Sequence, residues 1–97
     1  MINVDKTDPV WVVTLNRPDK ANALTERMLI DLRDTARAAQ AARGLILTGE
    51  GKVFSAGADL DAARAGLATS PLWEELSGAI AKLPFITIAA LNGTLAG

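Results

Sequence analysis

Two residue types that carry much of enzyme chemistry are missing from this chain of 97 residues, which has no cysteine and no histidine. Without cysteine, disulfide bonds and thiolate metal sites are excluded. Without histidine, the chain lacks the commonest general base and the commonest metal ligand, so it cannot form Ser–His or Cys–His nucleophilic pairs. Any catalysis by these residues must therefore use carboxylates, lysine or backbone dipoles, and we expect no metal site.

An excess of positive charge and long apolar runs are also lacking. Ten Lys and Arg against eleven Asp and Glu give a net charge of −1, whereas a nucleic-acid-binding surface needs net basic charge to neutralise phosphates. The N-terminus has no basic segment followed by an apolar run, as a signal peptide would have. The apolar stretches are too short to cross a bilayer. We therefore expect a cytoplasmic protein with no nucleic-acid partner and no membrane association.

The hydrophobic pattern predicts strands separated by helices. After a first strand within residues 1–8, we expect strands at 10–15, 45–48 and 85–91. The last three are nearly continuous in apolar residues, as in strands that are buried on both faces.

Helices are expected between these strands. Thr25 is placed to cap a helix running to about Ala42, a short alanine-rich helix follows residue 60 and breaks near Gly66, and Ser70-Pro71 opens a third helix. Strands joined through helices need parallel crossovers. The pattern therefore predicts an α/β fold with a mostly parallel sheet in one partial domain, residues 1–97. Because no helix follows the last strand, we expect that the chain is the first part of a longer protein.

Residues 49–52, Gly-Glu-Gly-Lys, resemble a phosphate-binding loop only superficially. A Walker A loop would need glycine at Ile46 and serine or threonine at Val53, and a dinucleotide fingerprint would need glycine at Phe54. A turn after a strand is the better interpretation.

The segment from Ser55 to Ala58 consists of small residues between a strand and a helix, with Asp59 and Asp61 expected in the first helical turn. Free backbone amides at such a corner can bind an anion or a developing oxyanion. The alternative is a tight connection that needs small residues only for packing. Residues 92–97 repeat the pattern after the next strand, and two such corners can direct two amides at one point, as in an oxyanion hole.

Three segments in sequence order carry a family resemblance. Residues 16–24 (NRPDKANAL), 47–60 (LTGEGKVFSAGADL) and 88–97 (IAALNGTLAG) resemble the early loop, the central segment and the start of the glycine-rich signature of the enoyl-CoA hydratase/isomerase, or crotonase, family. The resemblance covers essentially the whole chain. It implies a spiral of ββα units, of which this chain would be the N-terminal portion.

The resemblance also implies a substrate held as a coenzyme A thioester. The backbone N–H of Ala58 would be one oxyanion-hole donor, and the second amide would come from the residue after Gly97, outside this chain. The resemblance implies that the substrate rests against an early loop and against the small-residue segment; these residues are Lys20, Ala21, Ala23, Ala56, Gly57, Ala58, Asp59 and Leu60. Lys20 could meet a CoA phosphate, although a solvated loop lysine is the simpler interpretation.

By the same resemblance, the reaction would be hydration of a 2-enoyl-CoA or a shift of its double bond, with no cofactor beyond the CoA of the substrate. Glutamates further along family chains transfer the proton, and Glu26, Glu50, Glu74 and Glu75 here are better explained as solvated or dipole-compensating residues. Family members commonly form homotrimers or hexamers. Two alternatives stay open: another reaction of the family, such as hydrolysis, dehalogenation or decarboxylation, and a catalytically inactive fragment or remnant.

Overall fold

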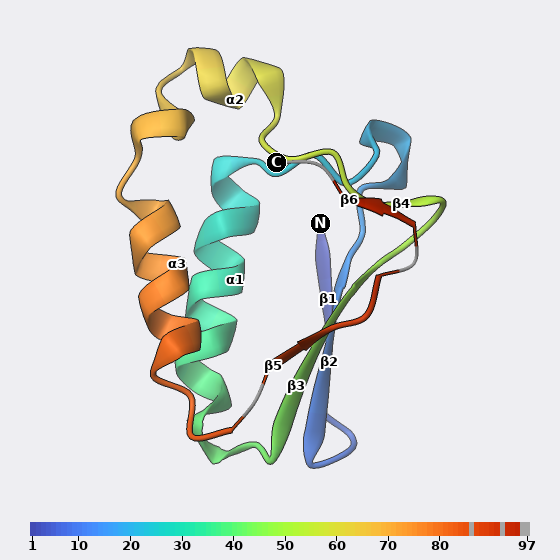
Figure 1. Cartoon of the computed structure of the whole chain (residues 1–97), viewed down its shortest axis with the longest axis vertical. Helices are drawn as coiled ribbons and strands as arrows, with labels where there is room; N and C mark the ends of the chain where they lie inside the picture. Colours follow the sequence, from blue (N-terminus) through green and yellow to red (C-terminus); the bar gives the residue numbers. More distant parts are fainter. Residues whose placement is uncertain (86, 92, 96–97) are drawn as a thin grey trace.

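The computed structural model describes residues 1–85, 87–91 and 93–95. The strands are β1 (Ile2–Asp5), β2 (Val10–Leu15), β3 (Gly44–Gly49), β4 (Val53–Ser55), β5 (Thr87–Ala89) and β6 (Thr94–Leu95). The α-helices are α1 (Glu26–Ala38), α2 (Leu60–Arg64) and α3 (Leu72–Ala81), and single 3₁₀ turns lie at Pro18–Lys20, Ala39–Ala41 and Leu67–Thr69 (Figure 1).

Two sheets share these strands. The larger has the order β1-β2-β3-β5, and the smaller pairs β4 with β6. Among the described strand pairs, β1–β2 is antiparallel, whereas β2–β3, β3–β5 and β4–β6 are parallel. After the helical segment α2–α3, the chain thus returns to both sheets in its earlier direction. This ββα order with parallel return is a spiral, and the predicted mostly parallel α/β fold is confirmed.

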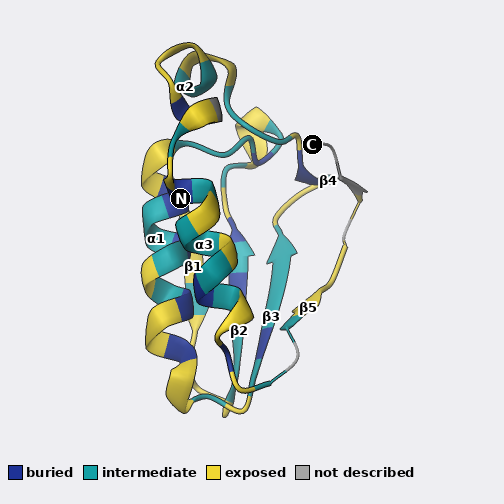
Figure 2. Ribbon diagram, turned by 60° about the vertical axis from the view of Figure 1, so that its left-hand side comes forward, coloured by how far each residue is buried: buried dark blue, intermediate teal, exposed yellow. Residues whose placement is uncertain are grey.

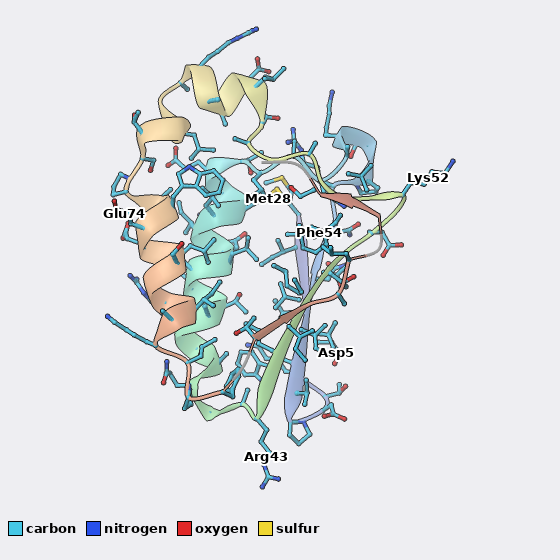
Figure 3. All side chains as sticks on the ribbon, in the orientation of Figure 1. Asp5, Met28, Arg43, Lys52, Phe54 and Glu74 are labelled. Carbon is cyan, nitrogen blue, oxygen red and sulfur yellow. The ribbon has the colours of Figure 1, made fainter. Side chains whose placement is uncertain are left out.

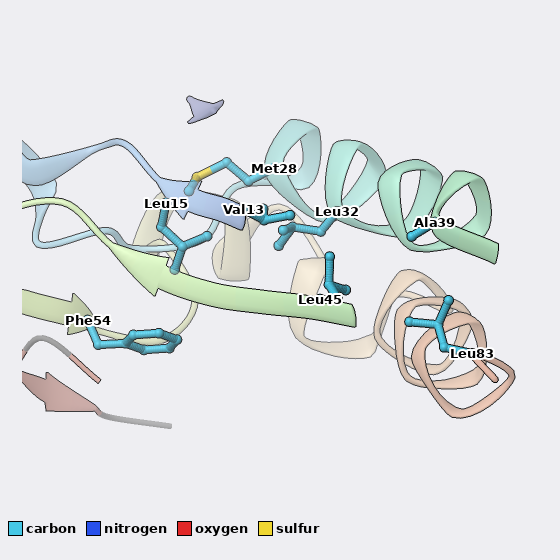
Figure 4. Close-up of a cluster of buried hydrophobic side chains, with 8 residues drawn as sticks. All are labelled: Val13, Leu15, Met28, Leu32, Ala39, Leu45, Phe54 and Leu83. Atoms are coloured by element: carbon cyan, nitrogen blue, oxygen red, sulfur yellow. The ribbon is translucent and has the colours of Figure 1, made fainter. Parts of the chain in front are cut away.

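Helices α1 and α3 pack side by side over one face of the larger sheet (Figure 1). Helix α1 begins where predicted, because the Thr25 hydroxyl accepts a hydrogen bond from the Met28 amide at 3.2 Å. Its apolar face meets the inward side chains of β2 and β3. Figure 4 shows the resulting core, which consists of Val13, Leu15, Met28, Leu32, Ala39, Leu45, Phe54 and Leu83.

The prediction of strands buried on both faces was wrong. In β2, Val13 and Leu15 are buried toward the helices, while the alternate residues stay partly exposed. Strand β5 is shorter than expected, and Ile88 and Leu91 are each 56% exposed. Strand β5 lies at the edge of the larger sheet, and no described segment covers its outer side (Figure 2). Apolar composition alone does not distinguish such an edge from a central strand.

Element boundaries differ from the prediction by small amounts. Helix α1 ends at Ala38 and continues as a 3₁₀ turn to Ala41. Helix α3 begins at Leu72, one residue later than expected, and the Ser70 hydroxyl accepts from the Leu72 amide at 3.2 Å. Strand β4 was not expected as a strand, because three residues are too few to show a period. Within the described residues, no helix is both long and apolar enough to span a bilayer.

Candidate functional site

Two connecting segments lie against each other at one end of the fold. One is the loop between β2 and α1, and the other joins β4 to α2 (Figure 1). Leu24 and Ala58 form an isolated parallel bridge between them. The Leu24 amide donates to the Gly57 carbonyl at 2.7 Å, and the Asp59 amide donates to the Leu24 carbonyl at 2.8 Å. These hydrogen bonds hold both neighbours of Ala58.

The bridge determines the direction of the Ala58 amide. In a parallel pairing, one residue bonds to the two neighbours of its partner, and the partner's own N–H and C=O point to the other side. The N–H of Ala58 therefore points away from Leu24. Within the described residues, no hydrogen bond to this N–H is found, and Ala58 lines an open pocket. The amide is thus placed to donate to a ligand.

Asn22 anchors the loop that carries Leu24. It is fully buried and has a left-handed backbone with φ of 54°, which asparagine tolerates better than most residues. Its Oδ1 accepts from the Arg17 amide at 2.8 Å, and its Nδ2 donates to the carbonyls of Glu50 at 2.9 Å and Val53 at 2.8 Å. The Ser55 hydroxyl donates to the Asn22 carbonyl at 3.0 Å. One side chain thus ties the early loop to both ends of the β3–β4 turn.

Gly57 allows the chain to bend between β4 and Ala58. Its φ is +87°, in the region that glycine enters without steric cost. The Gly57 amide donates to the Ser55 hydroxyl at 3.1 Å, and the Ala56 amide donates to the Ala21 carbonyl at 2.9 Å. The amides of Ala56 and Gly57 are thus hydrogen-bonded within the protein, whereas no such bond to the Ala58 amide is found among the described residues.

Asp59 caps helix α2 rather than lying in its first turn as predicted; Asp61 does lie in that turn. Asp59 Oδ1 accepts from the Ala62 amide at 3.0 Å, and Asp59 Oδ2 accepts from Arg17 Nη1 at 2.8 Å. The Ala62 N–H, and next the Arg17 guanidinium, hold the pKa of the Asp59 carboxyl below its ordinary value. This carboxylate is therefore occupied in two protein contacts.

The pocket beside these segments has a volume of about 540 Å³. Six predicted substrate-binding residues line it, and these are Lys20, Ala23, Ala56, Ala58, Asp59 and Leu60. The other two, Ala21 and Gly57, lie behind the lining, where their carbonyls accept hydrogen bonds from Ala56 and Leu24. The structure brings the eight residues together, and their roles stay predictions.

Three further lining residues were not among the predicted substrate-binding residues: Arg17, Asp61 and Arg64. Arg17 lies within the NRP segment, but only the folded chain brings it to Asp59, 42 positions later. Lys20 and Arg64 add two exposed cations to the pocket.

Other sequence expectations have mixed outcomes. Lys52 projects from the β3–β4 turn away from the body of the molecule (Figure 3), as expected for a turn and not for a phosphate-binding lysine. Among the described residues that line the pocket, none is a glutamate. Residues 92, 96 and 97 of the second predicted corner lie outside the described residues.

Comparison with known proteins agrees with this arrangement. The family described as enoyl-CoA hydratase/isomerase matches residues 5–97. A protein of Mycobacterium tuberculosis (strain H37Rv) named "Probable enoyl-CoA hydratase EchA14" is 37% identical over 105 residues, covering 100% of this chain and 40% of the relative. The 4-chlorobenzoyl coenzyme A dehalogenase-2 of an Arthrobacter species is 30% identical, covering 99% of this chain and 39% of the relative.

The fold is found in solved structures as well. The crystal structure of the enoyl-CoA hydratase from Bacillus anthracis superposes with a TM-score of 0.79 at 35% identity, covering 95% of this chain and 40% of that structure. The chain thus spans about 40% of the length of the relatives it matches. The predicted crotonase fold is confirmed, and the chain belongs to the enoyl-CoA hydratase/isomerase family.

Proposed function

We propose that the protein carrying this chain acts on acyl-CoA thioesters and that the Ala58 N–H is one donor of its oxyanion hole. The observation that carries the proposal is the Leu24–Ala58 bridge, which occupies the groups on both sides of Ala58 and directs the Ala58 amide away from Leu24. Membership of the enoyl-CoA hydratase/isomerase family supports the same substrate class.

The chemistry needs a donor of this kind. Addition of water at C3 of a 2-enoyl thioester, or removal of the γ-proton that allows its double bond to move, places negative charge on the thioester oxygen. A backbone amide held in position by its neighbours stabilises that charge without having to reorganise during the reaction, and loss of one such donor costs about 100- to 1,000-fold in rate. The second donor in this proposal is the amide of residue 98, which follows the given sequence.

The CoA portion of the substrate would lie along the pocket. Ala23, Ala56 and Ala58 present small side chains there, so that a flat or extended group can approach the backbone. The exposed ammonium of Lys20 and guanidinium of Arg64 supply positive charge at the same pocket. Phosphates of CoA are the complementary groups.

The reaction we propose is hydration of a 2-enoyl-CoA or movement of its double bond. It requires no metal or redox cofactor, and its proton-transfer groups come from outside this chain. A homotrimer or hexamer and a cytoplasmic location belong to the same proposal. The dehalogenase among the relatives makes another family reaction the main alternative.

The test is turnover by the complete translation product of the gene. We expect it to consume crotonyl-CoA or a longer 2-enoyl-CoA, and the loss of the enoyl thioester absorbance measures this consumption. Residues 1–97 expressed alone should show negligible turnover, because they hold only one donor. A folded product that binds CoA thioesters without hydrating or isomerising them would favour another family reaction. A product that neither binds nor turns them over would identify an inactive remnant.

A further inference from the structure

Arg17 connects the two segments between which Ala58 lies. Its Nη1 donates to the Asp59 carboxylate at 2.8 Å and to the Ala23 carbonyl at 2.9 Å. Ala23 precedes Leu24, and Asp59 follows Ala58, so a single nitrogen bridges the residues that flank the Leu24–Ala58 pairing. The side chains of Arg17 and Asp59 are only 19% and 17% exposed.

Both partners of this ion pair are themselves held in place. The Arg17 amide donates to Asn22 Oδ1 at 2.8 Å, and the Arg17 carbonyl accepts from the Asn22 amide at 2.9 Å. The second oxygen of Asp59 accepts from the Ala62 amide of helix α2 at 3.0 Å. The pair therefore joins an anchored loop to a capped helix, and little freedom is left between them.

Charge-assisted hydrogen bonds of this length are about twice as strong as neutral ones. Surface ion pairs usually add little, but this one is mostly shielded and its guanidinium also satisfies a backbone carbonyl. Its position beside the proposed donor, rather than its contribution to stability, is what makes it relevant to function.

We infer that Arg17 is a positioning residue: by holding Ala23 and Asp59 together, it sets the direction of the Ala58 amide in the thioester site. This inference rests on the proposed function. Both side-chain contacts of Arg17 are made within the protein. The more exposed cations of the pocket, Lys20 and Arg64, are therefore left to bind phosphate, although Arg64 Nη1 also lies 4.0 Å from Asp61 Oδ1. Rearrangement of about 1 Å at a reacting group can cost about 100-fold in rate.

The experiment measures kcat and KM for crotonyl-CoA, and the Kd of free CoA by calorimetry, in the complete translation product. For Arg17→Met, we expect kcat to fall about 10- to 100-fold while the Kd of CoA changes less than about threefold. Arg17→Lys should recover much of the loss, because both contacts are made by one nitrogen. Lys20→Met should show the opposite pattern, a higher Kd for CoA with kcat largely kept.

Three further variants extend the test, and one of them, Asp59→Asn, keeps it decisive even if Arg17→Met does not fold. Asp59→Asn retains an oxygen that can accept from the Ala62 amide, and it should lower kcat in the same way as Arg17→Met. The double variant with Arg17→Met and Asp59→Asn should have a kcat no lower than that of the less active single variant. Arg27→Gln, which breaks the exposed Arg27–Asp31 pair, should leave kcat unchanged.

The outcomes separate the two proposals. Wild-type protein without activity on any CoA thioester overturns the proposed function and this inference with it. Active wild-type protein whose Arg17 or Asp59 variants lose CoA affinity but keep kcat overturns only the inference, and shows that Arg17 binds the phosphates directly. Fully additive effects of the two substitutions would also contradict it.

Discussion

Leu24 and Ala58 lie opposite each other in a single parallel bridge, although they are far apart in sequence and belong to no regular strand. The bridge uses both backbone groups of Leu24 and neither of those of Ala58. This one pairing gives the small-residue segment a defined direction, and the first prediction depends on it.

Substitution Ala58→Pro removes the proposed donor, because proline has no N–H. If the complete protein turns over a 2-enoyl-CoA, kcat should fall about 100- to 1,000-fold. Ala58→Gly keeps the amide and is the matched control, with a much smaller effect. Steady-state kinetics on both variants, with circular dichroism to confirm folding, make the comparison. A well-folded proline variant with wild-type kcat would show that this N–H is not a donor.

Loss of the Asn22 side chain should be one of the most destabilising single changes in the early loop. Asn22→Ala leaves the Arg17 amide and the carbonyls of Glu50 and Val53 without their partner. Unpaired buried groups cost about 1–3 kcal/mol each, and we expect a total on the order of 3 kcal/mol in the free energy of unfolding.

Urea denaturation measures this loss. Asn22→Gly separates the contribution of the side-chain hydrogen bonds from that of the backbone conformation. Glycine adopts the left-handed φ of 54° without strain but makes no side-chain hydrogen bonds. Asn16→Ala, at an exposed position of the same loop, should change the free energy of unfolding by less than about 0.5 kcal/mol. Equal effects at positions 16 and 22 would contradict the anchoring role.

Two glycines should respond oppositely to alanine. A Cβ on Gly93 would overlap the carbonyl oxygen of Lys52, next to β4, so Gly93→Ala should lower the free energy of unfolding by about 1–3 kcal/mol. Gly78 lies within helix α3 with no heavy atom near its Cβ position, and Gly78→Ala should add about 0.5–1 kcal/mol. Thermal unfolding of the two variants compares them directly. A stabilised Gly93→Ala variant would mean that β4 and β6 do not approach as described.

Two threonines test a buried hydroxyl. Thr87 Oγ1 is buried and has no hydrogen-bond partner among the described residues. Thr87 borders a small apolar space beside Leu45, Leu76 and Ile80. Thr87→Val removes the unpaired group at constant volume and should raise the free energy of unfolding by about 1 kcal/mol. Thr48 Oγ1 instead donates to the Ala90 carbonyl at 2.8 Å, so Thr48→Val should lower it by about 0.5–1.5 kcal/mol. Chemical denaturation would refute the first expectation if both variants were destabilised.

Acid should remove the stabilisation that Asp59 provides. The pKa of its carboxyl is lowered in the folded state, first by the Ala62 N–H and then by Arg17. Such a group stabilises the fold above its unfolded pKa of about 3.9, and this contribution is lost as the pH falls through the lower, folded pKa. The midpoint of thermal unfolding of Asp59→Asn should therefore lie below that of the wild type at pH 7, and the difference should shrink below about pH 4.

Asp5 gives a comparison at a distant site. The Thr7 hydroxyl and amide hold the pKa of the Asp5 carboxyl below its usual value. The midpoint of thermal unfolding of Asp5→Asn should also lie below that of the wild type at pH 7. This difference should shrink below about pH 4 whether or not Asp59 is present. A difference for Asp59→Asn that stays constant from pH 7 to pH 3 would show that the ion pair does not titrate as described.

The sequence by itself determined the local elements and the family. Thr25, the spacing of the apolar residues after it and the small residues before Asp59 each act on near neighbours, so the capped helix, the positions of the longer strands and the corner could be predicted. The three motifs in order were enough to indicate a crotonase fold and six of the nine residues that line the pocket.

Only the tertiary structure decided which groups are engaged and which are not. Three contacts join positions that are about 30 to 40 residues apart: Leu24 with Ala58, Arg17 with Asp59, and Asn22 with Val53. Such contacts depend on the path of the chain between them, which no local pattern records. The exposure of β5 has the same origin, because an apolar run shows what a strand can bury and not where in the sheet it lies.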